Sequence, residues 1–99
     1  MRDAADLIRV LEAARELLVW PDNDYASSSW TDAESAEGEL DEFIARLQDG
    51  ASVDRTDLNV LFAAGGPIQE VGLASGWADA FQRLAADFSR ASARFQWDD

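Results

Sequence analysis

The chain has no cysteine and no histidine. Without cysteine it can form no disulfide framework, zinc knuckle or thiol nucleophile. Without histidine it lacks the commonest general base and metal ligand. Serine–histidine–aspartate triads, cysteine–histidine dyads and histidine-based zinc sites are therefore excluded. We expect a protein that is not an enzyme and that binds no cofactor and no metal ion.

Lysine is also absent, and so are long apolar runs. No stretch approaches the ~20 consecutive apolar residues that span a bilayer. The first residues carry acids inside an amphipathic pattern, unlike a signal or transit peptide. We therefore expect a soluble, cytoplasmic protein without membrane association. The use of arginine alone, together with abundant alanine, suggests a GC-rich bacterial genome.

The chain has 99 residues, of which 47% are hydrophobic. This length predicts a single domain, residues 1–99, with one core of its own. Apolar residues at helical spacing predict a first helix over residues 3–19, which Pro21 ends. A second helix is expected after a capping box formed by Thr31 and Glu34, and Gly50 ends it.

The last helix is expected to begin after Ser75, as its N-cap, and to run to about Arg94. Between these helices, residues 58–73 contain two short runs of β-favouring residues on either side of Ala64-Gly-Gly-Pro67. They favour a β-hairpin, because Pro67 and Gly72 are poor helix residues. The resulting expectation is a mainly helical α+β domain with two N-terminal helices, a short hairpin and a C-terminal helix. An all-α four-helix domain is the alternative.

The charge is strongly negative and unevenly placed. The net charge is −12, and the segment from Asp22 to Glu42 contributes −8, with eight acids and no basic residue. On the second helix Glu34, Glu37 and Asp41 form one strip, in which two like charges four residues apart destabilise the helix. A solvated face is one interpretation. The other is a surface for a basic partner, since this charge repels nucleic acid and anionic lipid.

Aromatic residues accompany the acids. Tyrosine and tryptophan are enriched at binding hot spots, where neighbouring acids steer a basic partner. Tyr25 is expected to be exposed, whereas core packing is an alternative role for Trp20 and Trp30. The candidate partner-binding residues are Asp22, Asp24, Tyr25, Trp30, Glu34, Glu37 and Asp41.

One local pattern resembles small bacterial proteins without an assigned activity. It consists of Leu61-Phe62, Gly66-Pro67, Ile68-Gln69-Glu70 and Gly76-Trp77, and it implies no function. In size, acidity and helical content the chain also resembles immunity proteins that neutralise nuclease toxins. That resemblance implies the presentation of acids and aromatics to a basic cleft.

These observations favour a non-enzymatic protein-binding module, with an immunity-type inhibitor of a basic toxin as its most concrete form. The alternative is a self-associating structural protein. It would require more apolar surface than one domain buries, and its candidate residues are Trp77, Phe81, Phe88, Phe95 and Trp97.

Overall fold

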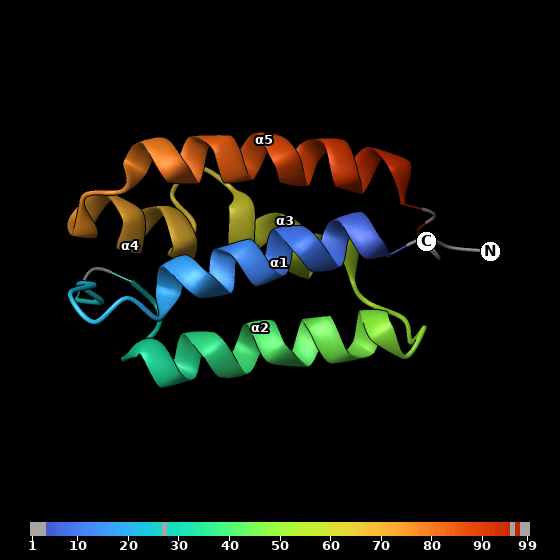
Figure 1. Ribbon diagram of the computed structural model, residues 1–99, viewed down its shortest axis with the longest axis horizontal. Coiled ribbons are helices and arrows are strands. Elements are labelled where there is room, and N and C mark those ends of the chain that lie inside the picture. The colour runs from blue at the N-terminus through green and yellow to red at the C-terminus, as the bar shows by residue number, and fades with distance from the viewer. Residues whose placement is uncertain (1–3, 27, 96, 98–99) are drawn as a thin grey trace.

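The computed structural model describes residues 4–26, 28–95 and 97. Over these residues every regular element is a helix, so the expected α+β class with a hairpin is wrong, and the class is that of the all-α alternative. None of the described helices is both long and apolar enough to cross a membrane. The helices, drawn in Figure 1, are α1 (Ala5–Leu18), α2 (Ala33–Gln48), α3 (Arg55–Phe62), α4 (Pro67–Ser75) and α5 (Ala78–Arg94).

The segment expected to be a hairpin forms α3 and α4 instead. The side chain of Asp54 caps α3 by accepting a hydrogen bond of 2.8 Å from the amide N of Thr56. Pro67 is the first residue of α4, where the missing N–H costs nothing and the fixed φ suits a helix. The proline that counted against a helix is therefore the residue that starts one.

Glycines explain the sharp turns around α4. A Cβ on Gly66 would lie 2.4 Å from the carbonyl oxygen of Val60, so position 66, between α3 and α4, requires glycine. Gly76 has φ of +87° and ends α4 in the left-handed conformation that glycine adopts most easily. Gly66-Pro67 and Gly76-Trp77, which belong to the pattern noted in the sequence, therefore have structural roles at the two ends of α4.

Helix α1 lies between α2 and α5, with α3 and α4 on the far side of the view in Figure 1. The apolar stripes of α1 and α5 are both buried. Phe62 of α3 stacks on Phe88 of α5, with ring centroids 4.3 Å apart, and thereby joins α3 to α5. The buried stripe residues are Leu7, Leu11, Ala14 and Leu18 in α1, and Trp77, Phe81, Leu84, Phe88, Ala91 and Phe95 on and around α5.

Two expected helix starts are wrong, and a third is not described by the structure. Asp32, rather than a Thr31–Glu34 capping box, caps α2 by accepting a hydrogen bond of 2.9 Å from the amide N of Ser35. Ser75 lies at the end of α4 and does not cap α5, which follows Trp77 without a side-chain cap. The expected start of the first helix at residue 3 lies outside the described residues, and α1 begins at Ala5.

Candidate protein-binding surface

The candidate residues occupy the connection between α1 and α2 and the first turns of α2. Figure 1 shows this connection at the left end of the molecule, beside the end of α4. Asp22, Asp24, Tyr25 and Trp30 lie on the connection, whereas Glu34, Glu37 and Asp41 lie on α2.

Asn23 fixes the connection to the helices. Its side-chain N donates a hydrogen bond of 2.7 Å to the carbonyl of Leu17, at the end of α1. Its side-chain oxygen accepts a hydrogen bond of 2.9 Å from the indole N–H of Trp77. Next to it, the amide N of Asp24 donates to the hydroxyl oxygen of Ser75 at 2.8 Å. The connection is therefore held at the junction of α4 and α5.

The carboxylate of Asp24 takes part in a local turn. One of its oxygens accepts a hydrogen bond of 2.9 Å from the amide N of Ala26, which is the geometry that makes aspartate common in turns. Asp24 and Asp22 are both exposed. Across the described residues no group of three acids is arranged to hold a metal ion.

The aromatic residues of this segment differ from one another in their exposure. Trp30 is only 6% exposed and belongs to the core, so it supports the connection from beneath. Tyr25, expected to be exposed, is half-buried and donates a hydrogen bond to the carbonyl of Leu18. Burial raises the pKa of the Tyr25 phenol, because it disfavours the phenolate. Trp20 is the exposed aromatic of this segment, at 51%.

Trp20 lies on the wall of a surface groove of about 540 Å³ formed by the connection and the start of α2. Tyr25 lines the same groove, together with the exposed acids Asp24 and Asp32. Hydrogen bonds from Ser35 lower the pKa of Asp32, so its carboxylate is ionised near neutral pH. The groove therefore combines an accessible indole with two negative charges. We call it the acidic groove.

The acidic strip on α2 has an internal counter-charge that the sequence interpretation did not include. Arg15 of α1 places its Nε 2.7 Å from Oδ1 of Asp41 and a terminal guanidinium N 3.1 Å from Oε1 of Glu37. The hydrogen bond and charge of Asp41, aided by Glu37, raise the pKa of Arg15. The like-charge repulsion between Glu37 and Asp41 is therefore compensated from the neighbouring helix.

A sequence signal for Arg15 exists. It directly follows Ala14, which belongs to the buried stripe of α1, so its side chain leaves the helix at the border of the packed face. A long arginine at such a border reaches a neighbouring helix easily. The fold decides which helix is that neighbour, and the spacing of residues in the sequence does not indicate it.

The remaining candidate acids have no such partner. Within the described residues no salt bridge reaches Asp22, Asp24 or Glu34, all of which are exposed. The unpaired candidate acids therefore lie on the connection and in the first turn of α2, close to the acidic groove. Comparison with protein-family models, with curated proteins and with solved structures found no match to this chain.

Proposed function

We propose that this chain is a non-enzymatic protein-binding module whose acidic groove and adjoining acids receive a basic protein partner. The observation that carries the proposal is the exposure of Trp20 in a groove that also contains Asp24 and Asp32. A large exposed indole costs solvation free energy unless a partner covers it. Beside carboxylates it suits a cationic side chain, which is attracted both to the ring face and to the negative charge.

The surrounding charge supports the same partner class. The segment from Asp22 to Glu42 contains eight acids and no basic residue. Such a field accelerates encounter with a positively charged surface and repels competing anions. Asp22, Asp24 and Glu34 are the acids proposed to face the partner directly, whereas Glu37 and Asp41 contribute beside Arg15.

An immunity-type inhibitor of a toxin, acting in the bacterial cytoplasm, is the most concrete form of this proposal. A cleft that binds nucleic acid is positively charged, because it must neutralise phosphates. An acidic protein that occupies such a cleft competes with the substrate on electrostatic grounds. In this form Tyr25 and Trp30 support the shape of the connection, and Trp20 supplies the contact.

The structure gives little support to self-association, because the aromatic side chains proposed for it are mostly buried by the chain's own residues. Trp77, Phe81, Phe88 and Phe95 are each less than 10% exposed, and Trp97 is half-buried. The aromatic residues of the last helix therefore leave little apolar surface for a second copy to bury.

The test compares two triple variants with the same net charge. One neutralises acids of the proposed surface (Asp22→Asn, Asp24→Asn, Glu34→Gln), and the other neutralises exposed acids elsewhere (Glu12→Gln, Asp49→Asn, Asp79→Asn). A basic partner retained from native host lysate at low salt is purified, and its association rate is measured by surface plasmon resonance. The Asp24→Asn change keeps a side-chain oxygen that can accept the hydrogen bond from Ala26, so the turn is preserved.

We expect the surface triple to slow association roughly tenfold at low salt and the control triple to slow it far less. Trp20→Ala should mainly accelerate dissociation, because it removes a contact and no charge. Equal losses in the two triples would show that only net charge matters and would contradict the proposed surface. Failure to retain any basic partner at low salt would contradict the proposed function.

A further inference from the structure

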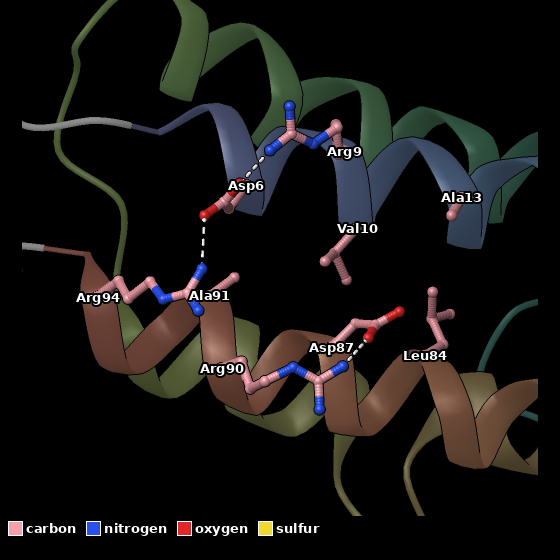
Figure 2. A pocket seen from close by; sticks show the side chains of 9 residues that line it. All are labelled: Asp6, Arg9, Val10, Ala13, Leu84, Asp87, Arg90, Ala91 and Arg94. Atoms are coloured by element: carbon pink, nitrogen blue, oxygen red, sulfur yellow. Dashed lines mark hydrogen bonds and ion pairs between the residues drawn. The ribbon is translucent and has the colours of Figure 1, made fainter.

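A second groove, of about 340 Å³, lies between α1 and α5 and differs from the rest of the surface in its charge. Figure 2 shows that arginines border it from both helices, with Arg9 on α1 and Arg90 and Arg94 on α5. Among the described residues, the only acids that line it are Asp6 and Asp87. Three positive and two negative charges give this groove a local charge of +1, in a chain whose net charge is −12. We call it the arginine groove.

The arginines are held by carboxylates but remain open to solvent. Asp6 pairs with Arg9 of its own helix and, at 3.4 Å, with Arg94 of α5, while Asp87 pairs with Arg90. The side chains of the three arginines are between 63% and 72% exposed. A guanidinium has five N–H donors, and two of these three groups share one carboxylate. N–H donors therefore remain for a further anion.

The floor of the groove is apolar. Val10 on α1 and Leu84 and Ala91 on α5 are each less than 10% exposed and lie between the two rows of charged side chains (Figure 2). A binding site that joins an apolar floor to a few placed polar groups is the usual form of a small-molecule site, and the volume is at the lower end of the usual range.

We infer that the arginine groove binds a small organic carboxylate with a hydrocarbon body. A carboxylate can match the planar guanidinium fork, and these arginines already pair with the carboxylates of Asp6 and Asp87. A single negative charge neutralises the local charge of +1, whereas a phosphate dianion leaves an excess negative charge in an acidic protein. The hydrocarbon body covers Val10 and Leu84, which an inorganic anion cannot do.

Octanoate is a suitable probe, with octanol as the uncharged control and acetate as the control without a hydrocarbon body. Backbone amide shifts are followed by NMR during each titration of the full chain at low salt. We expect saturable shifts at Val10, Leu84 and Ala91 with octanoate, and none with the two controls. Saturation by octanol, or octanoate shifts that centre outside α1 and α5, would overturn the inference. Absence of saturable shifts would also overturn it.

Three variants test the charge requirement. Arg90→Gln removes an arginine of the groove that pairs with Asp87 of its own helix, and Arg83→Gln is the matched control on α5 outside the groove. We expect Arg90→Gln to raise the octanoate Kd about 3- to 10-fold, since one charge-assisted contact is lost at an exposed position. Arg83→Gln should leave the Kd within about twofold. Asp87→Asn should lower the Kd, because it releases Arg90 and removes a competing carboxylate.

Equal Kd values in Arg90→Gln and Arg83→Gln would overturn the assignment of the anion to this groove. A raised Kd in Asp87→Asn would do so as well, because that variant makes the groove more positive. Circular dichroism of each variant checks that the helical content is unchanged. Stronger competition by inorganic phosphate than by hexanoate would overturn the carboxylate class.

Discussion

The indole N–H of Trp77 donates a hydrogen bond of 2.9 Å to the side-chain oxygen of Asn23, 54 positions earlier in the chain. Trp77 is only 5% exposed, so its donor has little access to water if Asn23 is removed. Together with the hydrogen bond from the Asp24 amide to Ser75, this contact joins the connection to the junction of α4 and α5.

Asn23→Ala should lower the free energy of unfolding by about 1–3 kcal/mol, because it removes the hydrogen bond to the Leu17 carbonyl and leaves the indole N–H of Trp77 unsatisfied. Urea unfolding followed by circular dichroism measures the change. Asn59→Ala, at an exposed position of α3, is the control and should change stability little. A loss in Asn23→Ala no larger than in the control would show that the indole finds another partner.

Gly72→Ala should be destabilising although alanine favours helices. A Cβ at this position would lie 2.9 Å from Cε3 and 3.0 Å from Cζ3 of the buried Trp77 ring, which must shift. Overpacking of this kind costs about 1–3 kcal/mol. Gly38→Ala in α2 meets nothing within 4 Å and should instead stabilise by about 0.5–1 kcal/mol. Thermal unfolding compares the two variants, and a stabilised Gly72→Ala would contradict the close packing.

Arg15→Gln should weaken the contact between α1 and α2 and at the same time release Glu37 and Asp41. Stability should fall at low salt, and the deficit should shrink as salt screens both the lost attraction and the new repulsion. Under the proposed function, a basic partner should associate faster with this variant than with Arg83→Gln, which has the same net charge. Equal rates would place the two acids outside the partner's contact.

Alkaline unfolding should report on Tyr25, the only tyrosine in a chain without lysine or cysteine. Burial raises its folded pKa above the unfolded value of about 10. The resulting stability is fully present below about pH 10 and is lost as pH rises towards the folded pKa, because the unfolded chain releases its proton first. Urea midpoints measured across this range should fall with pH.

Tyr25→Phe should remove this alkaline loss, because it has no ionisable group, while it also lacks the hydrogen bond to the Leu18 carbonyl. Its stability should therefore be lower than that of the unmodified chain at neutral pH and less dependent on pH above about 10. A tyrosinate absorbance titration of the folded protein that is centred at the unfolded pKa would contradict the burial of the phenol.

The apolar periodicity of the sequence was sufficient to predict the long helices. Leu7, Leu11 and Leu18 repeat at helical spacing, as do Phe81 and Phe88, and all of them are buried. The same reasoning failed for α3 and α4, which have 8 and 9 residues. In helices this short, few apolar positions repeat, and their stability comes mainly from tertiary packing such as that of Gly72 against Trp77.

The candidate surface was predictable in its charge but not in its aromatic contacts. Counting acids located the negative segment without knowledge of the fold. Whether Trp20 or Tyr25 is exposed depends on which neighbours cover each ring, and Tyr25 is half-buried where its hydroxyl reaches the carbonyl of Leu18. The counter-charge from Arg15 likewise depends on the packing of α1 against α2. Tertiary neighbours of this kind cannot be read from the spacing of residues in one segment.

The two grooves lie towards opposite ends of α1 in a molecule 40 Å long and 23 Å wide. Asp24 and Asp32 border the groove near the end of α1, whereas Arg9 and Arg94 border the one near its start. The molecule therefore has an electric dipole in addition to its net charge. The field of a basic surface exerts a torque on this dipole, which turns the acidic end towards that surface before contact. Two variants of identical net charge that differ only in which end is neutralised should consequently differ in their productive collision frequency.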